Sequence, residues 1–192
     1  MIVLFDVMDT LVYDPVHHEL PGFFGLNTKE LFARRDPAAW RLFEVDEISE
    51  RECLDRLFAA QPPFDHREFR DTVKRAYRWM DGMHELVQEL SAKKVEMHAF
   101  SNYSSWYEMI EERLQLTRYM PWTFVSFHTK IRKPAPEAYA NAIATLKHAP
   151  HELLFVDDRE VNCAPARTAG MHAERFVDAA GVRHRLTNLG VL

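Results

Sequence analysis

Two short apolar runs at opposite ends of the chain each stop at acidic residues. Residues 2–5 (Ile-Val-Leu-Phe) precede Asp6, and residues 153–156 (Leu-Leu-Phe-Val) precede Asp157 and Asp158. Continuous runs of this kind are typical of strands that are buried on both faces of a parallel sheet. Because ligands bind at the carboxyl ends of such strands, the pattern predicts that these acidic side chains meet at one site.

From residue 81 onward, helical patterns alternate with further apolar runs. Apolar residues spaced by three or four predict helices near residues 83–90, 106–114, 139–146 and 162–169. Apolar runs predict strands at 95–100, 124–126 and 173–176. This alternation is typical of a parallel sheet covered by helices, so we expect an α/β fold with a Rossmann-like sheet.

The segment between the first strand and residue 80 carries only helical signals. Asp36 before Pro37 is a typical helix start, and three pairs have the spacing of a capping box: Asn27 with Glu30, Ser49 with Glu52, and Asp65 with Glu68. We therefore predict a core of residues 1–14 and 81–192, with residues 15–80 forming a small helical cap over the carboxyl edge of the sheet.

Composition narrows the class of protein. The 192 residues suffice for one core with a modest insert, and the net charge of −5 argues against a broad nucleic-acid surface. No apolar run approaches the length of a membrane span, and the first strand begins without a basic leader. The only two cysteines, Cys53 and Cys163, fit a reducing compartment, so we expect a cytoplasmic protein. The scattered histidines do not predict a zinc site.

Four groups of polar residues follow the predicted strands or lie beside them: residues 6–10, Ser101 with Asn102, Lys133, and Asp157 with Asp158. An aspartate can attack phosphorus or carbon to form a covalent intermediate, and paired carboxylates can bind Mg²⁺. A serine hydroxyl and a lysine can hold the remaining oxygens of a phosphoryl group. These groups together are the complement that metal-assisted phosphoryl transfer requires.

At these positions the sequence resembles the haloacid dehalogenase (HAD) superfamily. FDVMDTL, FSN, KPAPEAY and VDDREVN match its four motifs in order and spacing. More narrowly, FDVMDTLVYDP, PGFFG, DGMHELVQEL and HAFSNY are similar to plant chloroplast flavin mononucleotide (FMN) hydrolases. The resemblance implies an HAD core with a C1-type cap, a Mg²⁺ cofactor and a small phosphate ester as substrate. Since the sequence starts without the transit peptide of those plant proteins, we expect a bacterial relative, either a monomer or a homodimer.

The resemblance also implies roles for individual residues. Asp6 would be the nucleophile and a metal ligand, and Lys133 would pair with it. The other metal ligands would be the backbone carbonyl of Met8, Asp158 with Asp157 beside it, and Asn162 through water. We expect the substrate to contact Thr10, Ser101, Asn102, Lys133, Tyr103 and Trp106, with Thr10 also supporting the loop of the first motif. The candidate catalytic residues are Asp6, Lys133, Ser101 and Asp9.

Met8 departs from the HAD phosphatase pattern, in which a second aspartate acts as the general acid at that position. Losing a positioned acid typically costs about 10²–10⁴ in rate. Asp9 could substitute, although an aspartate after a strand also commonly caps the following turn. Alternatively, water protonates the leaving group, or the reaction needs no acid.

The missing acid leaves two alternatives to a phosphatase open: a 2-haloacid dehalogenase and a protein that only binds its ligand. The 2-haloacid dehalogenases use no metal, and they need no acid because a halide leaves without a proton. The adjacent Asp157 and Asp158 favour the metal-dependent phosphatase, because they would repel each other without a cation. A scaffold kept only for binding would not need the intact Asp6, Lys133 and Asp158.

The substrate is implied by resemblance rather than by spacing. A flavin ring requires aromatic partners and an apolar wall, for which the candidates are Phe23, Phe24, Trp40, Tyr103, Trp106 and Tyr107. Sugar phosphates and other nucleotides are alternatives. We expect Lys130 and Arg132 to be surface charges near the entrance.

Overall fold

The computed structural model describes residues 1–57 and 64–192, in which five parallel strands form one sheet in the order β3-β2-β1-β4-β5. The strands are β1 (Ile2–Phe5), β2 (Met97–Ser101), β3 (Phe124–Val125), β4 (Leu153–Asp157) and β5 (His172–Arg175). The order changes direction between β1 and β4, which is the position where open α/β sheets bind ligands. The predicted Rossmann-like parallel sheet is confirmed.

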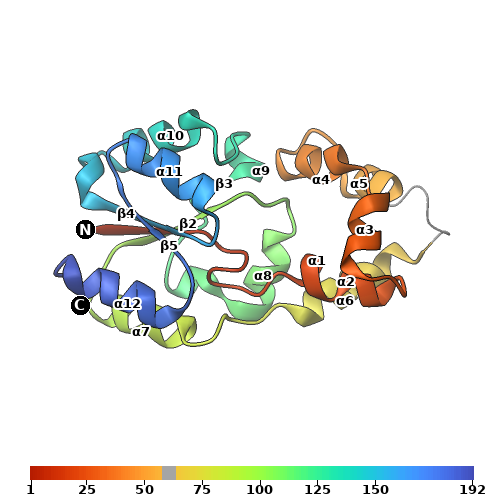
Figure 1. Cartoon of the computed structure of the whole chain (residues 1–192), viewed down its shortest axis with the longest axis horizontal. Coiled ribbons are helices and arrows are strands. Elements are labelled where there is room, and N and C mark those ends of the chain that lie inside the picture. The colour runs from red at the N-terminus through yellow and green to blue at the C-terminus, as the bar shows by residue number, and fades with distance from the viewer. Residues whose placement is uncertain (58–63) are drawn as a thin grey trace.

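Helices cover both faces of the sheet (Figure 1). The apolar side chains of β1 alternate between them: Ile2 and Leu4 pack with α10 and α11, whereas Val3 and Phe5 pack with α7, α8 and α12. These helices are α7 (Met83–Ala92), α8 (Tyr107–Leu114), α10 (Pro136–Leu146), α11 (Glu160–Thr168) and α12 (Ala179–Asn188). Because both faces are covered, the continuous apolar run of β1 is fully buried.

The structure differs from the predicted elements at two places. Ser126 does not extend β3 but begins the short helix α9 (Ser126–Thr129). The sequence interpretation also ended at the last strand and missed α12. Asp178 caps the start of this helix, since its side chain accepts a hydrogen bond from the backbone N–H of Gly181. Two 3₁₀ turns, η1 (Leu116–Arg118) and η2 (Pro150–Glu152), complete this part of the chain.

In the described part of the segment between residues 15 and 80, every regular element is a helix: α1 (Pro15–His18), α2 (Leu20–Phe23), α3 (Thr28–Arg34), α4 (Pro37–Glu44), α5 (Glu50–Leu57) and α6 (His66–Ala76). Residues 58–63 of the expected helical segment lie outside the described residues. The predicted capping box of Asn27 and Glu30 forms: the backbone N–H of Glu30 donates to the Asn27 side chain at 2.9 Å, and that of Asn27 donates to the Glu30 side chain at 3.0 Å. Asp65 instead accepts from the backbone N–H groups of Arg67 and Glu68.

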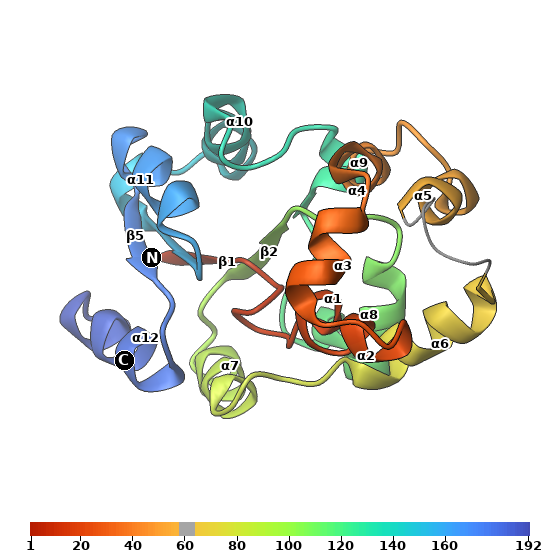
Figure 2. The same cartoon turned by 45° about the vertical axis from the view of Figure 1, so that its right-hand side comes forward.

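This helical insert lies beside the carboxyl ends of the strands (Figure 2). The two chain segments that join it to the sheet pair with each other: the N–H of Tyr13 donates to the carbonyl of Arg78 at 2.9 Å, and that of Met80 to Leu11 at 2.8 Å. The insert therefore enters and leaves the sheet at one place. Its status as a separate cap domain stays a prediction.

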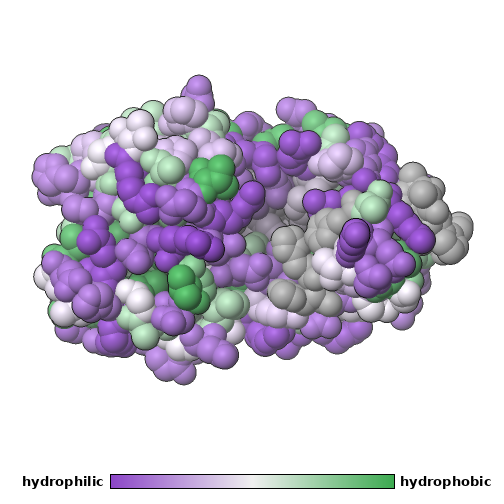
Figure 3. All heavy atoms as spheres, viewed as in Figure 1, coloured by the Kyte–Doolittle hydropathy of each residue, from purple (hydrophilic) through white to green (hydrophobic). Residues whose placement is uncertain are grey.

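The surface seen in Figure 3 is mostly hydrophilic, with small, separate hydrophobic areas. Large exposed apolar residues such as Val161 and Val177 are scattered, which is usual for a chain that buries its apolar side chains in a core. No helix among the described residues has the length and apolar character that crossing a membrane requires.

Candidate active site

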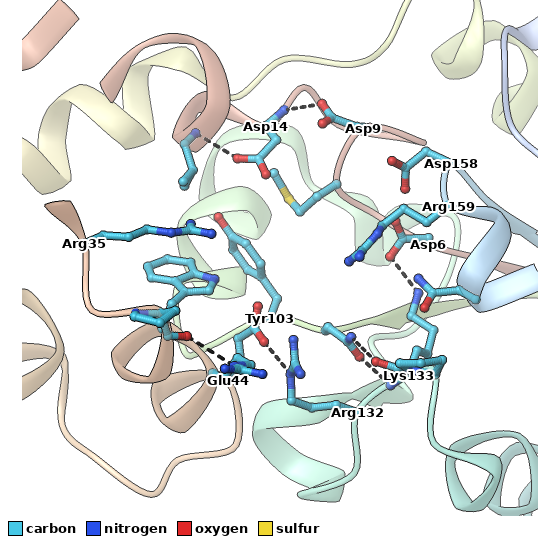
Figure 4. Close-up of a pocket in the computed structure, with 18 residues that line it drawn as sticks. Asp6, Asp9, Asp14, Arg35, Glu44, Tyr103, Arg132, Lys133, Asp158 and Arg159 are labelled. Carbon is cyan, nitrogen blue, oxygen red and sulfur yellow. Dashed lines mark hydrogen bonds and ion pairs between the residues drawn. The ribbon is translucent and has the colours of Figure 1, made fainter. Parts of the chain in front are cut away.

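The polar residues that follow β1, β2 and β4 come together at one edge of the sheet. Asp6 directly follows β1, and its backbone N–H donates to the carbonyl of Val156 on β4 at 2.8 Å. The edge opens into a cavity of about 430 Å³ between the sheet and the helical insert. Its lining includes Asp6, Met8, Asp9, Asn102, Lys133, Asp158 and Asn162 from the sheet side (Figure 4).

Lys133 is the centre of the polar network at this edge. Its side chain is 1% exposed, and its ammonium lies 2.8 Å from Oδ1 of Asp6, 2.7 Å from Oδ2 of Asp157 and 2.5 Å from the carbonyl of Phe100. Burial alone would lower the pKa of Lys133, but the two carboxylates raise it above its ordinary value. The lysine therefore stays charged, and it occupies one oxygen of Asp6.

Asn102 holds the backbone of Lys133 in place. Its side-chain amide donates to the carbonyl of Lys133 at 2.7 Å and accepts from the backbone N–H of the same residue at 2.8 Å. Asn102 lines the cavity, but both ends of its amide are used within the protein. Asn102 therefore positions Lys133, and its expected contact with the substrate stays a prediction.

Asp157 occupies a position that differs from the expected metal ligand. It is fully buried, and Oδ2 faces Lys133, while Oδ1 accepts from the backbone N–H of Arg159 at 2.9 Å. The amide of Asn162 donates to both oxygens, at 2.9 and 3.0 Å. Because both oxygens are engaged, Asp158 rather than Asp157 can present a carboxylate to a cation.

The donor set at this edge fits a divalent cation. Carboxylate oxygens of Asp6, Asp157 and Asp158 all lie within 4.8 Å of one another. Burial raises the pKa of Asp6. The charges of Asp157 and Asp158 raise this pKa further, whereas the charge of Lys133 lowers it. Burial and the charge of Asp157 likewise raise the pKa of Asp158 to about 6. A hard cation such as Mg²⁺ between Asp6 and Asp158 would relieve this excess of negative charge.

Two buried polar atoms on residues of the matched motifs have no hydrogen-bond partner among the described residues. They are the hydroxyl oxygen of Ser101, which is 1% exposed, and the amide oxygen of Asn162, which is 3% exposed. Buried polar groups without a partner are costly, so each one calls for an explanation such as a water or a ligand. Asn162 lines the cavity, so its place fits the expected role toward metal-bound water, whereas Ser101 is not among the lining residues.

Thr10 does not line the cavity. Its side chain is fully buried, and its hydroxyl accepts from the backbone N–H of Asp158 at 3.1 Å. This contact ties the loop of the first motif to the end of β4. The expected support of that loop is therefore observed, and the expected contact with substrate is not.

Met8 and Asp9 lie at the cavity wall. Oδ1 of Asp9 accepts from the backbone N–H of Asp14 at 3.0 Å, and Asp9 has a φ of 53°, a left-handed conformation that aspartate tolerates better than most residues. This geometry matches the turn-capping alternative for Asp9. The loop that follows Asp6 thus presents a thioether at Met8 and, at Asp9, a carboxylate that already accepts a hydrogen bond from the backbone.

The other end of the cavity is built mainly by the helical insert. Trp40 and Glu44 of α4 line it together with Tyr103 and Arg132 from the sheet side. Glu44 is 5% exposed, and its Oε2 lies 2.5 Å from Nε of Arg132. Burial raises the pKa of Glu44 to about 7 although Arg132 opposes the shift. Arg132, expected to be a surface charge, is therefore a cavity residue with a buried partner.

The candidate aromatic residues separate into two groups. Trp40 and Tyr103 line the cavity, and the hydroxyl of Tyr103 is 2.6 Å from that of Tyr77. The others do not line it. Trp106 is 1% exposed in the core, where its ring is 5.4 Å from that of Trp40, so its expected contact with substrate is not seen. The other candidate aromatic residues that do not line the cavity are Phe23, Phe24 and Tyr107.

Sequence reasoning missed several cavity residues. Arg35 and Glu44 belong to no motif, and only the folding of the insert onto the sheet brings them to the cavity. Asp14 also lines it, and its place within FDVMDTLVYDP was a signal that could have identified it. Arg159 lies inside VDDREVN, so its place next to Asp158 was a signal that could have identified it. Figure 4 shows its guanidinium pointing from the start of α11 toward Asp6.

Sequence comparisons agree with this geometry. Residues 7–175 match the family model of haloacid dehalogenase-like hydrolases. The chain is also 39% identical over 190 residues to flavin mononucleotide hydrolase 1, chloroplastic, of Arabidopsis thaliana. That similarity covers 99% of this chain and 78% of the plant protein.

Solved structures share the fold at low sequence identity. An HAD family enzyme from Bacteroides thetaiotaomicron superposes with a TM-score of 0.79 and 16% identity, covering 96% of this chain and 97% of that one. The same enzyme in complex with magnesium and inorganic phosphate gives a TM-score of 0.75 at 17% identity, covering 94% and 97%. L-2-haloacid dehalogenase from Xanthobacter autotrophicus gives 0.66 at 16% identity, covering 100% and 85%. From its matched motifs, its sheet and its plant relative, the chain belongs to the haloacid dehalogenase-like hydrolase family.

Proposed function

We propose that this hydrolase is a Mg²⁺-dependent phosphomonoesterase that forms an aspartyl phosphate on Asp6 and acts on FMN. The observation that carries the proposal is the meeting of Asp6, Lys133 and Asp158 at one end of the cavity. A nucleophilic carboxylate, a fixed ammonium and a second carboxylate suited to a cation are thereby placed within reach of one phosphoryl group. The 39% identity to a plant protein named flavin mononucleotide hydrolase supports FMN as the substrate.

Each step of phosphoryl transfer can be assigned to residues of this site. Lys133 holds Oδ1 of Asp6, so the other oxygen of that carboxylate can attack phosphorus. The P–O bond to the ribityl group then breaks, and the departing oxygen takes its proton from water, because Met8 supplies none. Ser101 would donate to a phosphoryl oxygen, while the charge of the Lys133 ammonium, whose three N–H groups are taken by Asp6, Asp157 and Phe100, would stabilise the phosphoryl group electrostatically. Water finally cleaves the aspartyl phosphate. Asp6 and Asp158 would hold Mg²⁺, which neutralises phosphoryl charge when bound.

Met8 is the observation that favours the second candidate, a dehalogenase. A halide leaves without a proton, so an acid at this position is unnecessary for that reaction. The clustered carboxylates of Asp6, Asp157 and Asp158 argue the other way, because one ammonium does not balance two buried acids and a third, half-buried one.

The decisive experiment measures phosphate release from FMN with Mg²⁺ and with a chelator, for the wild type and Asp6→Asn. We expect release that requires Mg²⁺ and disappears in Asp6→Asn, while thermal unfolding shows that the variant is folded. Chloride release from 2-chloropropionate that is indifferent to the chelator would support the dehalogenase instead. Binding of FMN without release of phosphate or halide would indicate a binding protein.

A further inference from the structure

The cavity has two chemically different ends, and adjacent residues of one loop serve them. Lys133 points to Asp6, whereas the side chain of its neighbour Arg132 points to Glu44 of the helical insert (Figure 4). At about 430 Å³ the cavity is much larger than a phosphate group needs and falls within the range of small-molecule sites. A phosphate ester bound at Lys133 therefore has its remaining part near Arg132 and the insert.

Glu44 fixes the orientation of the Arg132 guanidinium. It contacts Nε at 2.5 Å, and its own backbone carbonyl accepts from the hydroxyl of Ser126 at 2.7 Å, which ties α4 to the sheet side. With Nε taken, the guanidinium still carries two nitrogens and four N–H donors in one plane. A plane of donors fixed in this way suits carbonyl oxygens at the edge of a flat ring.

Trp40 provides a flat wall beside these donors. Its indole is half-buried and lines the cavity. The rings of Phe43, Tyr103 and Trp106 meet it at 5.9, 6.1 and 5.4 Å, at angles of 69° to 78°. These edge contacts hold the indole in one plane. A held aromatic plane is a stacking partner for another planar ring and loses little freedom when it binds one.

We propose that Arg132 and Trp40 bind the ring system of the flavin and thereby determine the specificity for FMN. Trp40 packs against the isoalloxazine ring, and Arg132, oriented by Glu44, donates hydrogen bonds to its carbonyl oxygens. This inference rests on the proposed FMN hydrolase function and adds the residues that distinguish FMN from a phosphate ester without a ring.

The first test compares two substrates, FMN and D-ribitol 5-phosphate, which is the same phosphate ester without the ring. The variant is Arg132→Lys, which keeps a cation beside Glu44 but removes the planar set of donors. We expect kcat/KM for FMN to fall roughly tenfold, the equivalent of about one lost charged hydrogen bond, while ribitol 5-phosphate stays within about twofold. An equal fall for both substrates, or no fall for FMN, would overturn the inference.

Lys130→Met is the matched control. Lys130 and Asp46 form an ion pair of 2.8 Å that also joins the loop to the insert, but neither residue lines the cavity. Because both partners are half-exposed, we expect kcat/KM for FMN to stay within about twofold. A loss as large as that of Arg132→Lys would mean that both variants act by loosening the insert, which also overturns the inference.

A binding measurement tests the ring site without turnover. Riboflavin, which has the ring but no phosphate, should bind the wild type with quenching of its fluorescence by Trp40, and Trp40→Leu should weaken binding roughly tenfold. Absence of riboflavin binding to the wild type, or equal binding to Trp40→Leu, would overturn the ring site even if FMN is hydrolysed. Failure of the wild type to hydrolyse FMN would instead overturn the proposed substrate, and with it the function on which the ring site rests.

Discussion

Replacing Lys133 with methionine removes the only ammonium that touches the carboxylates of Asp6 and Asp157 in the described structure. The Asp157 side chain is fully buried and that of Asp6 is 11% exposed, so water cannot replace the lost contact at Asp157. Removing one partner of a buried ion pair typically costs about 3–5 kcal/mol, a large part of the roughly 5–15 kcal/mol that stabilises a domain. We expect a loss of this size at pH 8, with most of it from Asp157.

The loss should depend on pH in a defined direction. Burial raises the folded-state pKa of Asp6, and Lys133 opposes that shift, so removing the ammonium raises this pKa further above the unfolded value of about 3.9. A carboxyl group whose pKa is raised by folding stabilises the folded state at low pH and loses that contribution as pH rises. The free-energy difference between Lys133→Met and the wild type should therefore be smaller at pH 5 than at pH 8.

Urea unfolding at both pH values, followed by tryptophan fluorescence, measures this difference. The added change Asp157→Asn should return about 1–2 kcal/mol of stability, because it removes one unpaired charge, but should not restore phosphate release. A cost below about 1 kcal/mol at pH 8, or the same cost at both pH values, would refute the reasoning that a buried charge network stabilises this site.

Two further predictions concern the first motif and the metal. Met8→Asp should keep or raise phosphate release from FMN, since a positioned acid can contribute about 10²–10⁴ in rate, and a large loss in a folded variant would contradict the assigned position of Met8. The affinity for Mg²⁺, measured by calorimetry, should rise between pH 5 and pH 8, because Asp158, with a pKa of about 6, must lose its proton to bind metal. Asp158→Asn should weaken binding at every pH, and a flat pH profile in the wild type would argue against Asp158 as a ligand.

The residues of the sequence motifs were predictable because they lie at strand ends. The runs before Asp6 and Asp158 identified buried strands, and in a parallel sheet the ends of neighbouring strands necessarily share one edge. The strand order, with β1 between β2 and β4, confirms that reasoning. The sequence did not predict that Asp157 pairs with the lysine while Asp158 faces the cavity, because this depends on which carboxylate Lys133 reaches in the folded protein.

The chain by itself determined the α/β sheet, the helical segment after the first strand and the place of Asp6, the proposed nucleophile. Local periodicity and the residue types at strand ends can be read from consecutive residues. Only the tertiary structure decided which side chains form the far end of the cavity. Glu44 and Arg132 are 88 positions apart and meet at 2.5 Å, and Trp40 reaches the cavity while Trp106 is buried behind it. Such contacts depend on how the insert packs against the sheet, and no spacing of residues along the chain encodes that orientation.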